Sequence, residues 1–168
     1  MEKRKEKVRK PTGPFFTIDP SINSLGWALW TKPTSSCNTR LIDFGLIESR
    51  DTDWLRSSKE MFTQLLDVTA QHSYRARNLY CETPVFFNPV TAKSGALVKL
   101  ASAFGLVQAC AYINKMSFHP VQIADWKGQL PKKIVNERIK DILGEVQCAH
   151  FKKDIWDAVG IGLYVQGK

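Results

Sequence analysis

Short hydrophobic runs separated by turn-forming residues occupy the chain between residues 15 and 47. Their spacing predicts three β-strands, over residues 15–19, 26–30 and 41–47. Proline, asparagine and serine residues fill the connections, which are short enough for an antiparallel meander. We therefore expect a sheet that begins with three antiparallel strands.

After this meander, hydrophobic residues with helical spacing alternate with further strand-like runs. The predicted elements are helices at 53–72 and 92–116, strands at 78–82 and 118–123, and helices at 131–143 and 153–165. The order β-β-β-α-β-α-β-α-α predicts an α/β fold with a mixed five-stranded sheet flanked by helices.

Composition indicates one folded domain preceded by a basic segment. The chain has 168 residues, is 43% hydrophobic and carries a formal net charge of +8. Its first ten residues hold six Lys/Arg against two Glu. We expect a flexible basic arm over residues 1–13 and a single domain over residues 14–168. The positive charge favours a polyanionic partner.

The chain lacks the sequence signatures of several classes of protein. The charged N-terminus has no apolar stretch of the kind found in signal peptides, so we expect an intracellular, cytoplasmic protein without a membrane partner. The four cysteines form no Cys-x-x-Cys pair, which leaves zinc ribbons and thioredoxin-like sites unsupported. The chain has no complete G-x-x-x-x-G-K-[ST] loop and is too short for both halves of an actin-like ATPase, so we expect no nucleotide cofactor.

Four carboxylates lie at the ends of apolar segments. Asp19 and Glu82 end two predicted strands, whereas Asp154 and Asp157 begin the last predicted helix. If the first and fourth strands are neighbours, Asp19 and Glu82 meet at adjacent strand ends. Asp154 and Asp157 are three residues apart and project from one helical face, so they can reach the same point.

Carboxylate oxygens are the ligands that Mg²⁺ and Mn²⁺ prefer. Hydrolysis of a phosphodiester by two such ions, about 4 Å apart, needs a cluster of this kind. We therefore predict a nuclease in which Asp19, Glu82, Asp154 and Asp157 are catalytic and hold two Mg²⁺ ions, with Mn²⁺ able to substitute. A turn position for Asp19 and a helix N-cap for Asp154 are alternatives, but neither accounts for Glu82.

The sequence around these acids resembles the RuvC family of Holliday junction resolvases, especially its phage-type members. Residues 18–28 resemble the first acidic motif, 80–82 the second, and 154–158 the closing D-x-x-D-A motif. Residues 94–105 and 125–133 resemble segments that lie between the second and closing motifs. One departure is that a serine, residue 21, follows Asp-Pro where the family usually has glycine.

The resemblance implies an RNase H-like fold, a homodimer, and paired Mg²⁺-dependent incisions of four-way DNA junctions. It also implies that the four acids are the metal ligands and that Asp19 bridges both ions. Cutting two symmetric strands needs two sites related by a two-fold axis. We expect the apolar helix at 92–116 and its preceding loop to form the dimer interface.

Candidate DNA contacts are aromatic or basic residues near the acids. Phe86 or Phe87 could wedge between unstacked bases, or could instead anchor the loop or the dimer core. Lysines that could contact phosphates, or could simply be solvated, are Lys99, Lys127, Lys132, Lys133, Lys152 and Lys153.

The function we predict is a structure-selective endonuclease that resolves Holliday junctions or other branched DNA. Two alternatives stay open. One is another RNase H-like nuclease that cuts RNA–DNA hybrids, flaps or other branches. The other is a non-catalytic junction-binding protein, which would not need all four acids.

Overall fold

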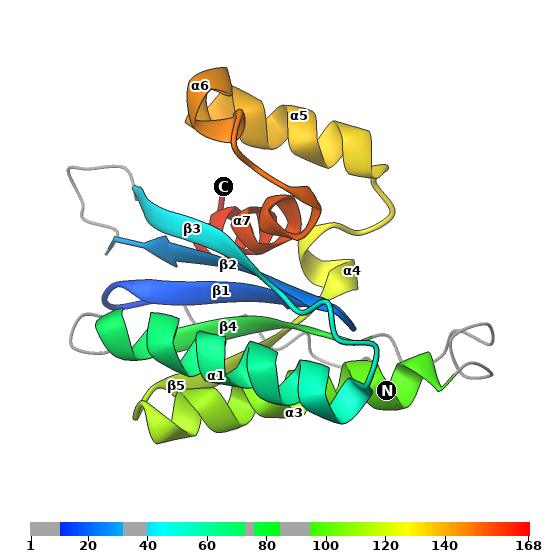
Figure 1. The fold of residues 1–168 in the computed structure, drawn as a ribbon. Coiled ribbons are helices and arrows are strands. Elements are labelled where there is room, and N and C mark those ends of the chain that lie inside the picture. The colour runs from blue at the N-terminus through cyan, green and yellow to red at the C-terminus, as the bar shows by residue number, and fades with distance from the viewer. Residues whose placement is uncertain (1–10, 32–39, 73–75, 85–94) are drawn as a thin grey trace, which may run out of the picture.

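The computed structural model describes residues 11–31, 40–72, 76–84 and 95–168. A twisted five-stranded sheet forms the centre of the molecule, with strand order β3-β2-β1-β4-β5 (Figure 1). The strands are β1 (Phe15–Pro20), β2 (Ser24–Trp30), β3 (Leu41–Glu48), β4 (Asn78–Thr83) and β5 (Ser117–Gln122).

The sheet is mixed, as predicted. β1 pairs with β2 and β2 with β3 in antiparallel fashion, while β4 runs parallel to both β1 and β5. The predicted adjacency of the first and fourth strands is therefore confirmed. Their register pairs Ile18 with Cys81, so Asp19 and Glu82 are the next residues along the two strands.

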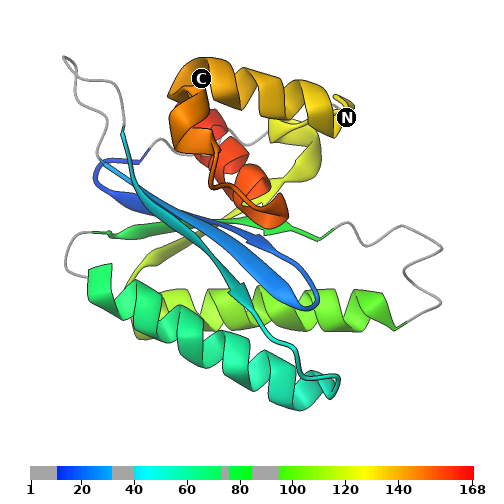
Figure 2. The same cartoon turned by 45° about the horizontal axis from the view of Figure 1, so that its top comes forward.

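Helices cover both faces of the sheet (Figures 1 and 2). α1 (Trp54–His72) and α3 (Ala96–Ile113) pack side by side on one face. α7 (Lys153–Val165) lies on the other face against β1 and β2, and α5 (Lys132–Leu143) packs outside α7. Two short helices that the sequence pattern did not predict are α4 (Ile123–Trp126) and α6 (Glu145–Cys148).

Alternation along the strands separates the hydrophobic core into two layers. Phe15 of β1 and Tyr80 of β4 point toward α7. Phe16 and Ile18, the alternate residues of β1, point toward α1 and α3. Both layers are fully buried at these positions. Successive residues of a strand therefore face different helical layers, and residues two apart face the same one.

The predicted boundaries differ from the observed ones by a few residues. The fifth strand begins and ends one residue earlier than predicted, because Ile123 already starts α4. The predicted start of the long helix, residues 92–94, lies outside the described residues. Asp53 caps α1 by accepting a hydrogen bond from the Arg56 backbone N–H at 3.0 Å.

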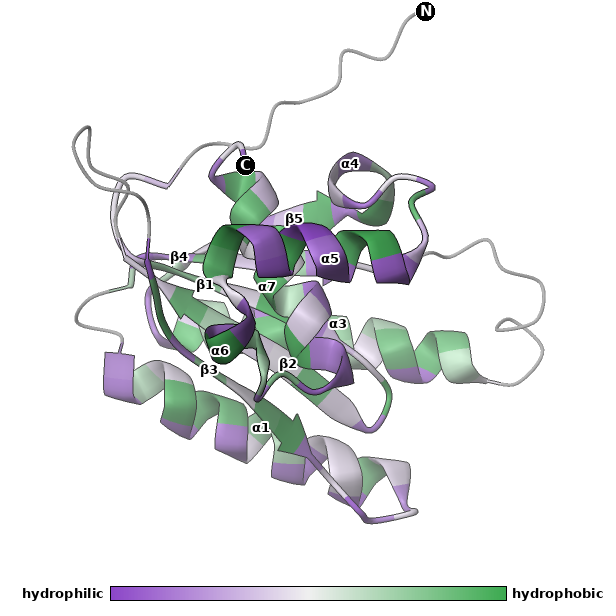
Figure 3. Cartoon of the chain, turned by 90° about the horizontal axis from the view of Figure 1, so that it is seen from above, coloured by the Kyte–Doolittle hydropathy of each residue, from purple (hydrophilic) through white to green (hydrophobic). Residues whose placement is uncertain are grey.

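α3 has an unusual surface for a helix that packs on a sheet. By length and composition alone it is apolar enough to cross a membrane, yet only 22% of it is buried inside the protein. The exposed residues Val98, Tyr112 and Ile113 account for part of the apolar surface. Segments coloured as hydrophobic recur along α3 in Figure 3. Because its other side packs against α1, β4 and β5, α3 is a core helix with an apolar face that the described part of the chain leaves uncovered.

Candidate active site

The alternation of side chains along β1 and β4 brings Asp19 and Glu82 to the same face of the sheet. Asp19 lies two residues after Thr17 and four after Phe15, on the side of β1 that faces α7. Glu82 lies two residues after Tyr80, whose ring also faces α7. Asp19 belongs to β1 and pairs with Gly26, so the alternative that it is a turn residue is wrong.

α7 supplies the other two acids from its first turns. Asp154 is 7% exposed, and its Oδ2 accepts a hydrogen bond from the Ser24 hydroxyl of β2. The N-cap of this helix is Lys152, so Asp154 is not the cap. The Asp157 side chain is 13% exposed. The amino end of α7 therefore places two carboxylates over the strand ends that carry Asp19 and Glu82.

The four acids are close enough to perturb one another. Burial raises the pKa of Asp19 well above its usual value, and repulsion from Glu82, Asp157 and Asp154 raises it further. The Lys132 ammonium acts in the opposite direction. All four predicted carboxylates thus belong to one electrostatic cluster, which forms from β1, β4 and α7.

Glu82 has its own partner in this cluster. Burial raises the pKa of Glu82 to about 7, and the Trp126 hydrogen bond partly opposes that rise. The indole Nε1 of Trp126 donates this bond to Oε2 of Glu82 at 2.9 Å. Repulsion from Asp157 raises the Glu82 pKa, whereas Lys127 and Lys132 lower it.

Two of the lysines that could contact DNA phosphates pair with Asp157 in the free protein. Lys132 Nζ lies 2.5 Å from Oδ2, and Lys127 Nζ lies 3.6 Å from Oδ1. Oδ1 is buried and accepts no hydrogen bond within the described part of the chain. The ammonium groups therefore balance part of the negative charge in the cluster, and one carboxylate oxygen keeps unused acceptor capacity.

The donor set suits a hard divalent cation, because it consists of carboxylate oxygens that repel one another and include an oxygen without a hydrogen bond. Yet among the residues that the structure describes, no three His, Cys, Asp or Glu side chains form a ready-made metal site. Protein donors occupy the acids instead: Ser24 on Asp154, Trp126 on Glu82, and the lysines on Asp157. The predicted ligands converge, but in an arrangement held by internal donors.

None of the other predicted DNA contacts in the described part of the chain forms an ion pair with the four acids. Lys152 is paired with Glu48 at 3.7 Å, and Lys133 and Lys153 are exposed. Lys99 lies on the first turn of α3, in the helical layer on the opposite face of the sheet from α7. Phe86 and Phe87 lie outside the described residues. The assignment of these residues to DNA stays a prediction.

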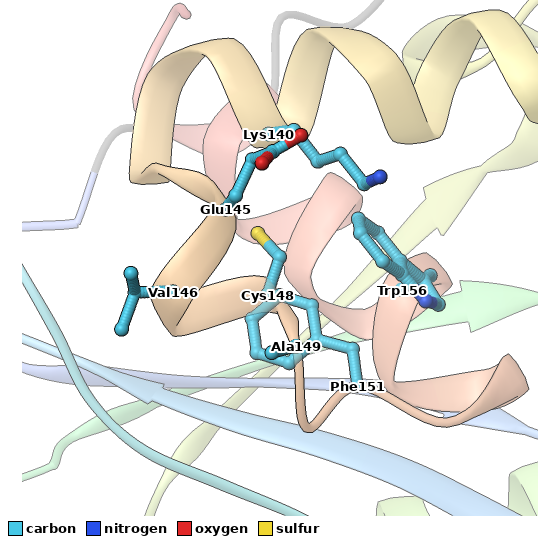
Figure 4. A pocket seen from close by; sticks show the side chains of 7 residues that line it. All are labelled: Lys140, Glu145, Val146, Cys148, Ala149, Phe151 and Trp156. Atoms are coloured by element: carbon cyan, nitrogen blue, oxygen red, sulfur yellow. The ribbon is translucent and has the colours of Figure 1, made fainter.

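The described part of the chain also forms a cavity of about 550 Å³ (Figure 4). Its lining comes from α5, α6, the segment between α6 and α7, and the start of α7, and it includes none of the four acids. The lining residues are Lys140, Glu145, Val146, Cys148, Ala149, Phe151 and Trp156. The candidate site is therefore the acidic cluster at the strand ends and not this hollow.

Sequence reasoning missed two residues that hold the acids in place. Ser24 and Trp126 lie 130 and 44 residues from their partners, so no local pattern could link them. Trp126 does lie in the segment at 125–133 that resembles resolvases, and that likeness was the available signal.

Comparison with protein-family models and with curated proteins finds no match. Comparison with solved structures does find matches. The structure of Thermus thermophilus RuvC matches with a TM-score of 0.69 at 20% identity, over 89% of this chain and 91% of that one. RuvC of the same organism in complex with a Holliday junction substrate matches with a TM-score of 0.71 at 19% identity, over 90% of each chain. The Holliday junction resolvase of fowlpox virus matches with a TM-score of 0.57 at 13% identity, over 92% of this chain and 99% of that one.

The chain has the RNase H-like fold of these resolvases. The high coverage on both sides means that the likeness involves the whole fold and not a shared sheet alone. The resemblance indicated by the acidic motifs is thus confirmed for the fold.

Proposed function

We propose that this protein is a divalent-cation-dependent endonuclease that resolves Holliday junctions and related branched DNA. The observation that carries the proposal is the convergence of Asp19, Glu82, Asp154 and Asp157 from three elements into one cluster. Burial and mutual repulsion make such a cluster unfavourable for folding alone, which favours a functional reason for keeping it. The net charge of +8 and the fold shared with junction resolvases support DNA as the substrate.

The four acids are the groups that would hold Mg²⁺ or Mn²⁺. Bound cations would supply Lewis acidity and charge neutralisation at the scissile phosphate. In hydrolysis, the oxygen of water bonds to phosphorus, one bridging P–O bond breaks, and the released alkoxide oxygen takes up a proton. Ser24 keeps the Asp154 carboxylate directed into the cluster by its hydrogen bond to Oδ2.

In the described part of the chain, Lys127 and Lys132 are the lysines that form ion pairs with an acid of the cluster. Both pair with Asp157, and both side chains keep some contact with solvent. We infer that they exchange this carboxylate for a DNA phosphate when metal and substrate bind. Their positive charge would then lie beside the phosphate that is cut.

A homodimer fits this activity because a junction resolvase must cut two strands related by a two-fold axis. The uncovered apolar face of α3 is the surface that we assign to the second copy. A protomer in isolation leaves Val98, Tyr112 and Ile113 exposed on this face. Large apolar patches of this kind on soluble proteins mark interaction surfaces.

The proposal is tested by cleavage of a synthetic four-way DNA junction in Mg²⁺. The wild-type protein should cut two opposed strands, and Asp19→Asn should abolish cutting while still binding the junction in Ca²⁺. Asp141→Asn removes an acid on the exposed side of α5 and serves as the matched control that keeps activity. Full activity in Asp19→Asn would overturn the mechanism.

The same assay separates the alternatives. An RNA–DNA hybrid or a flap cut more efficiently than the junction would replace resolution by one of those activities. If the protein binds the junction tightly but does not cut it in either Mg²⁺ or Mn²⁺, the alternative of a non-catalytic junction-binding protein is favoured.

A further inference from the structure

Trp126 contacts the acidic cluster from a helix that the sequence pattern did not predict. β5 lies beside β4 in a register that pairs Glu82 with Val121, and α4 begins two residues after Val121. The chain therefore turns away from the sheet directly beside Glu82. Trp126 ends α4, and its indole N–H reaches Oε2 of Glu82 at 2.9 Å.

The other side of the indole is fixed by α7. A Cβ built on Gly160 would lie 2.5 Å from Cζ3 of Trp126 and 3.2 Å from Cε3. Only a residue without a side chain leaves room for the ring at this distance. Gly160 lies three residues after Asp157, on the same helical face. The indole therefore connects Glu82 of β4 to the face of α7 that carries Asp157.

Lys127 completes this arrangement. Its Nζ lies 5.5 Å from the centroid of the Trp126 ring and 3.6 Å from Oδ1 of Asp157. The ring and the ammonium of two consecutive residues thus contact acids from two different elements. This geometry restrains the indole on three sides, so its N–H has one direction in which to donate.

We propose that Trp126 is a positioning residue that fixes the orientation of the Glu82 carboxylate for binding a divalent cation. The inference rests on the proposed function, because it takes Glu82 to be a metal ligand. A free Glu82 side chain would turn away from like-charged Asp157. The indole is a donor without charge and without acceptor capacity, so it holds Oε2 without cancelling the negative charge that a cation requires. A lysine in this position would orient Glu82 but would also neutralise it.

The contact itself is tested by the indole N–H resonances of the free protein. The chain has five tryptophans, and the resonance lost in Trp126→Phe identifies the one in question. At a pH above the Glu82 pKa of about 7, where Glu82 is a carboxylate, Glu82→Gln should move that resonance upfield, because a neutral amide oxygen is a weaker acceptor than a carboxylate. The Trp30 indole, which donates to Thr17 at 3.0 Å, is the internal control and should not move. An unchanged Trp126 resonance in Glu82→Gln would overturn the inference.

The role in cation binding is tested by calorimetric titration with Mn²⁺ in the absence of DNA. Loss of a residue that orients a metal ligand typically weakens metal affinity by about 10–100-fold. Trp126→Phe should show such a loss, with an unchanged KM for the junction and a reduced kcat. Trp54→Phe makes the same chemical change on α1, across the sheet, and should bind Mn²⁺ like the wild type. Equal affinity in Trp126→Phe and the wild type would contradict the proposal.

Gly160→Ala provides a second variant that leaves both partners chemically intact. The added methyl should displace the indole, reproduce the weaker Mn²⁺ binding, and move the Trp126 resonance upfield. A folded Gly160→Ala protein with wild-type affinity would argue against positioning by the ring. A wild-type protein that binds no Mn²⁺ would instead overturn the proposed function, whatever the indole resonances show.

Discussion

Gly26 of β2 and Asp154 of α7 are in direct backbone contact. A Cβ built on Gly26 would overlap the carbonyl group of Asp154 and would lie 2.8 Å from the backbone nitrogen of Ile155. Gly26 is also the residue that pairs with Asp19 in the sheet. The absence of a side chain at one strand position therefore determines how closely the amino end of α7 approaches Asp19. The Ser24 hydroxyl, two residues earlier on the same face, holds the Asp154 carboxylate.

Gly26→Ala should displace the start of α7 from the sheet. Because the neighbouring atoms are backbone, they cannot yield by rotating a side chain, and we expect a loss of about 1–3 kcal/mol in the free energy of unfolding. Junction cleavage should fall with it, since Asp154 moves relative to Asp19. Urea denaturation and the cleavage assay measure the two effects.

Gly13→Ala is the matched control, because nothing lies within 4 Å of a Cβ built there. Gly13 lies before β1 and outside the helices and strands, so this variant should change the free energy of unfolding by no more than about 0.5 kcal/mol. Equal stabilities for the two variants would contradict the close approach of β2 and α7.

The acidic cluster should make the metal-free protein less stable as the pH rises. The pKa of Glu82 is about 7 in the folded protein, against an ordinary value of 4.5. Between these values the folded state holds a proton that the unfolded state has released. The contribution of Glu82 to the free energy of unfolding is therefore most favourable below about pH 4.5 and decreases as the pH rises to about 7. The loss from this group is on the order of 3 kcal/mol. Asp19, whose pKa is also raised, acts in the same direction.

The measurement is the difference in unfolding free energy between the wild type and Glu82→Gln, in EDTA, on both sides of this pH window. The amide cannot titrate, so the free energy of unfolding of the variant should increase relative to that of the wild type as the pH rises. A difference that does not change with pH would show that Glu82 titrates normally.

Asp19→Asn should stabilise the metal-free protein while abolishing cleavage. The substitution replaces a buried carboxylate, repelled by three others, with a neutral group of the same shape. Saturating Mg²⁺ should raise the melting temperature of the wild type, because a ligand that binds only the folded state stabilises it. The same Mg²⁺ should raise that of the variant much less. Equal Mg²⁺-induced shifts in both proteins would remove Asp19 from the metal site.

Features that depend on local pattern could be predicted from the sequence. The continuous apolar runs of β1 and β4 predict buried strands ending in Asp19 and Glu82, and the apolar stretch after Asp154 predicts a helix packed on the sheet. The three-residue spacing of Asp154 and Asp157 places both on one helical face. Convergence of the acids followed from these local facts and from the adjacency of two strands.

Features that depend on contacts between distant segments could not be predicted in the same way. α4 has four residues, which is too few to display a helical period, and so the position of Trp126 was hidden. Lys127 and Lys132 were predicted as phosphate contacts, but in the free protein the nearest negative charge is Asp157. Charge alone does not tell whether a lysine beside an acidic site contacts the site or the substrate.

Charge introduced on the uncovered face of α3 should separate the proposed dimer without unfolding the protomer. Val98 is 69% exposed and Ile113 61% exposed, so Val98→Glu and Ile113→Glu should not disturb the core of a single copy. In a dimer, each substitution would bury a carboxylate in two symmetric places. Sedimentation should therefore change from dimer to monomer, with loss of paired cutting. Leu55→Glu on α1, where Leu55 is 77% exposed, should leave both properties unchanged. A wild-type protein that is monomeric at micromolar concentration would contradict the proposed dimer, and variants that remain dimeric would place the interface elsewhere.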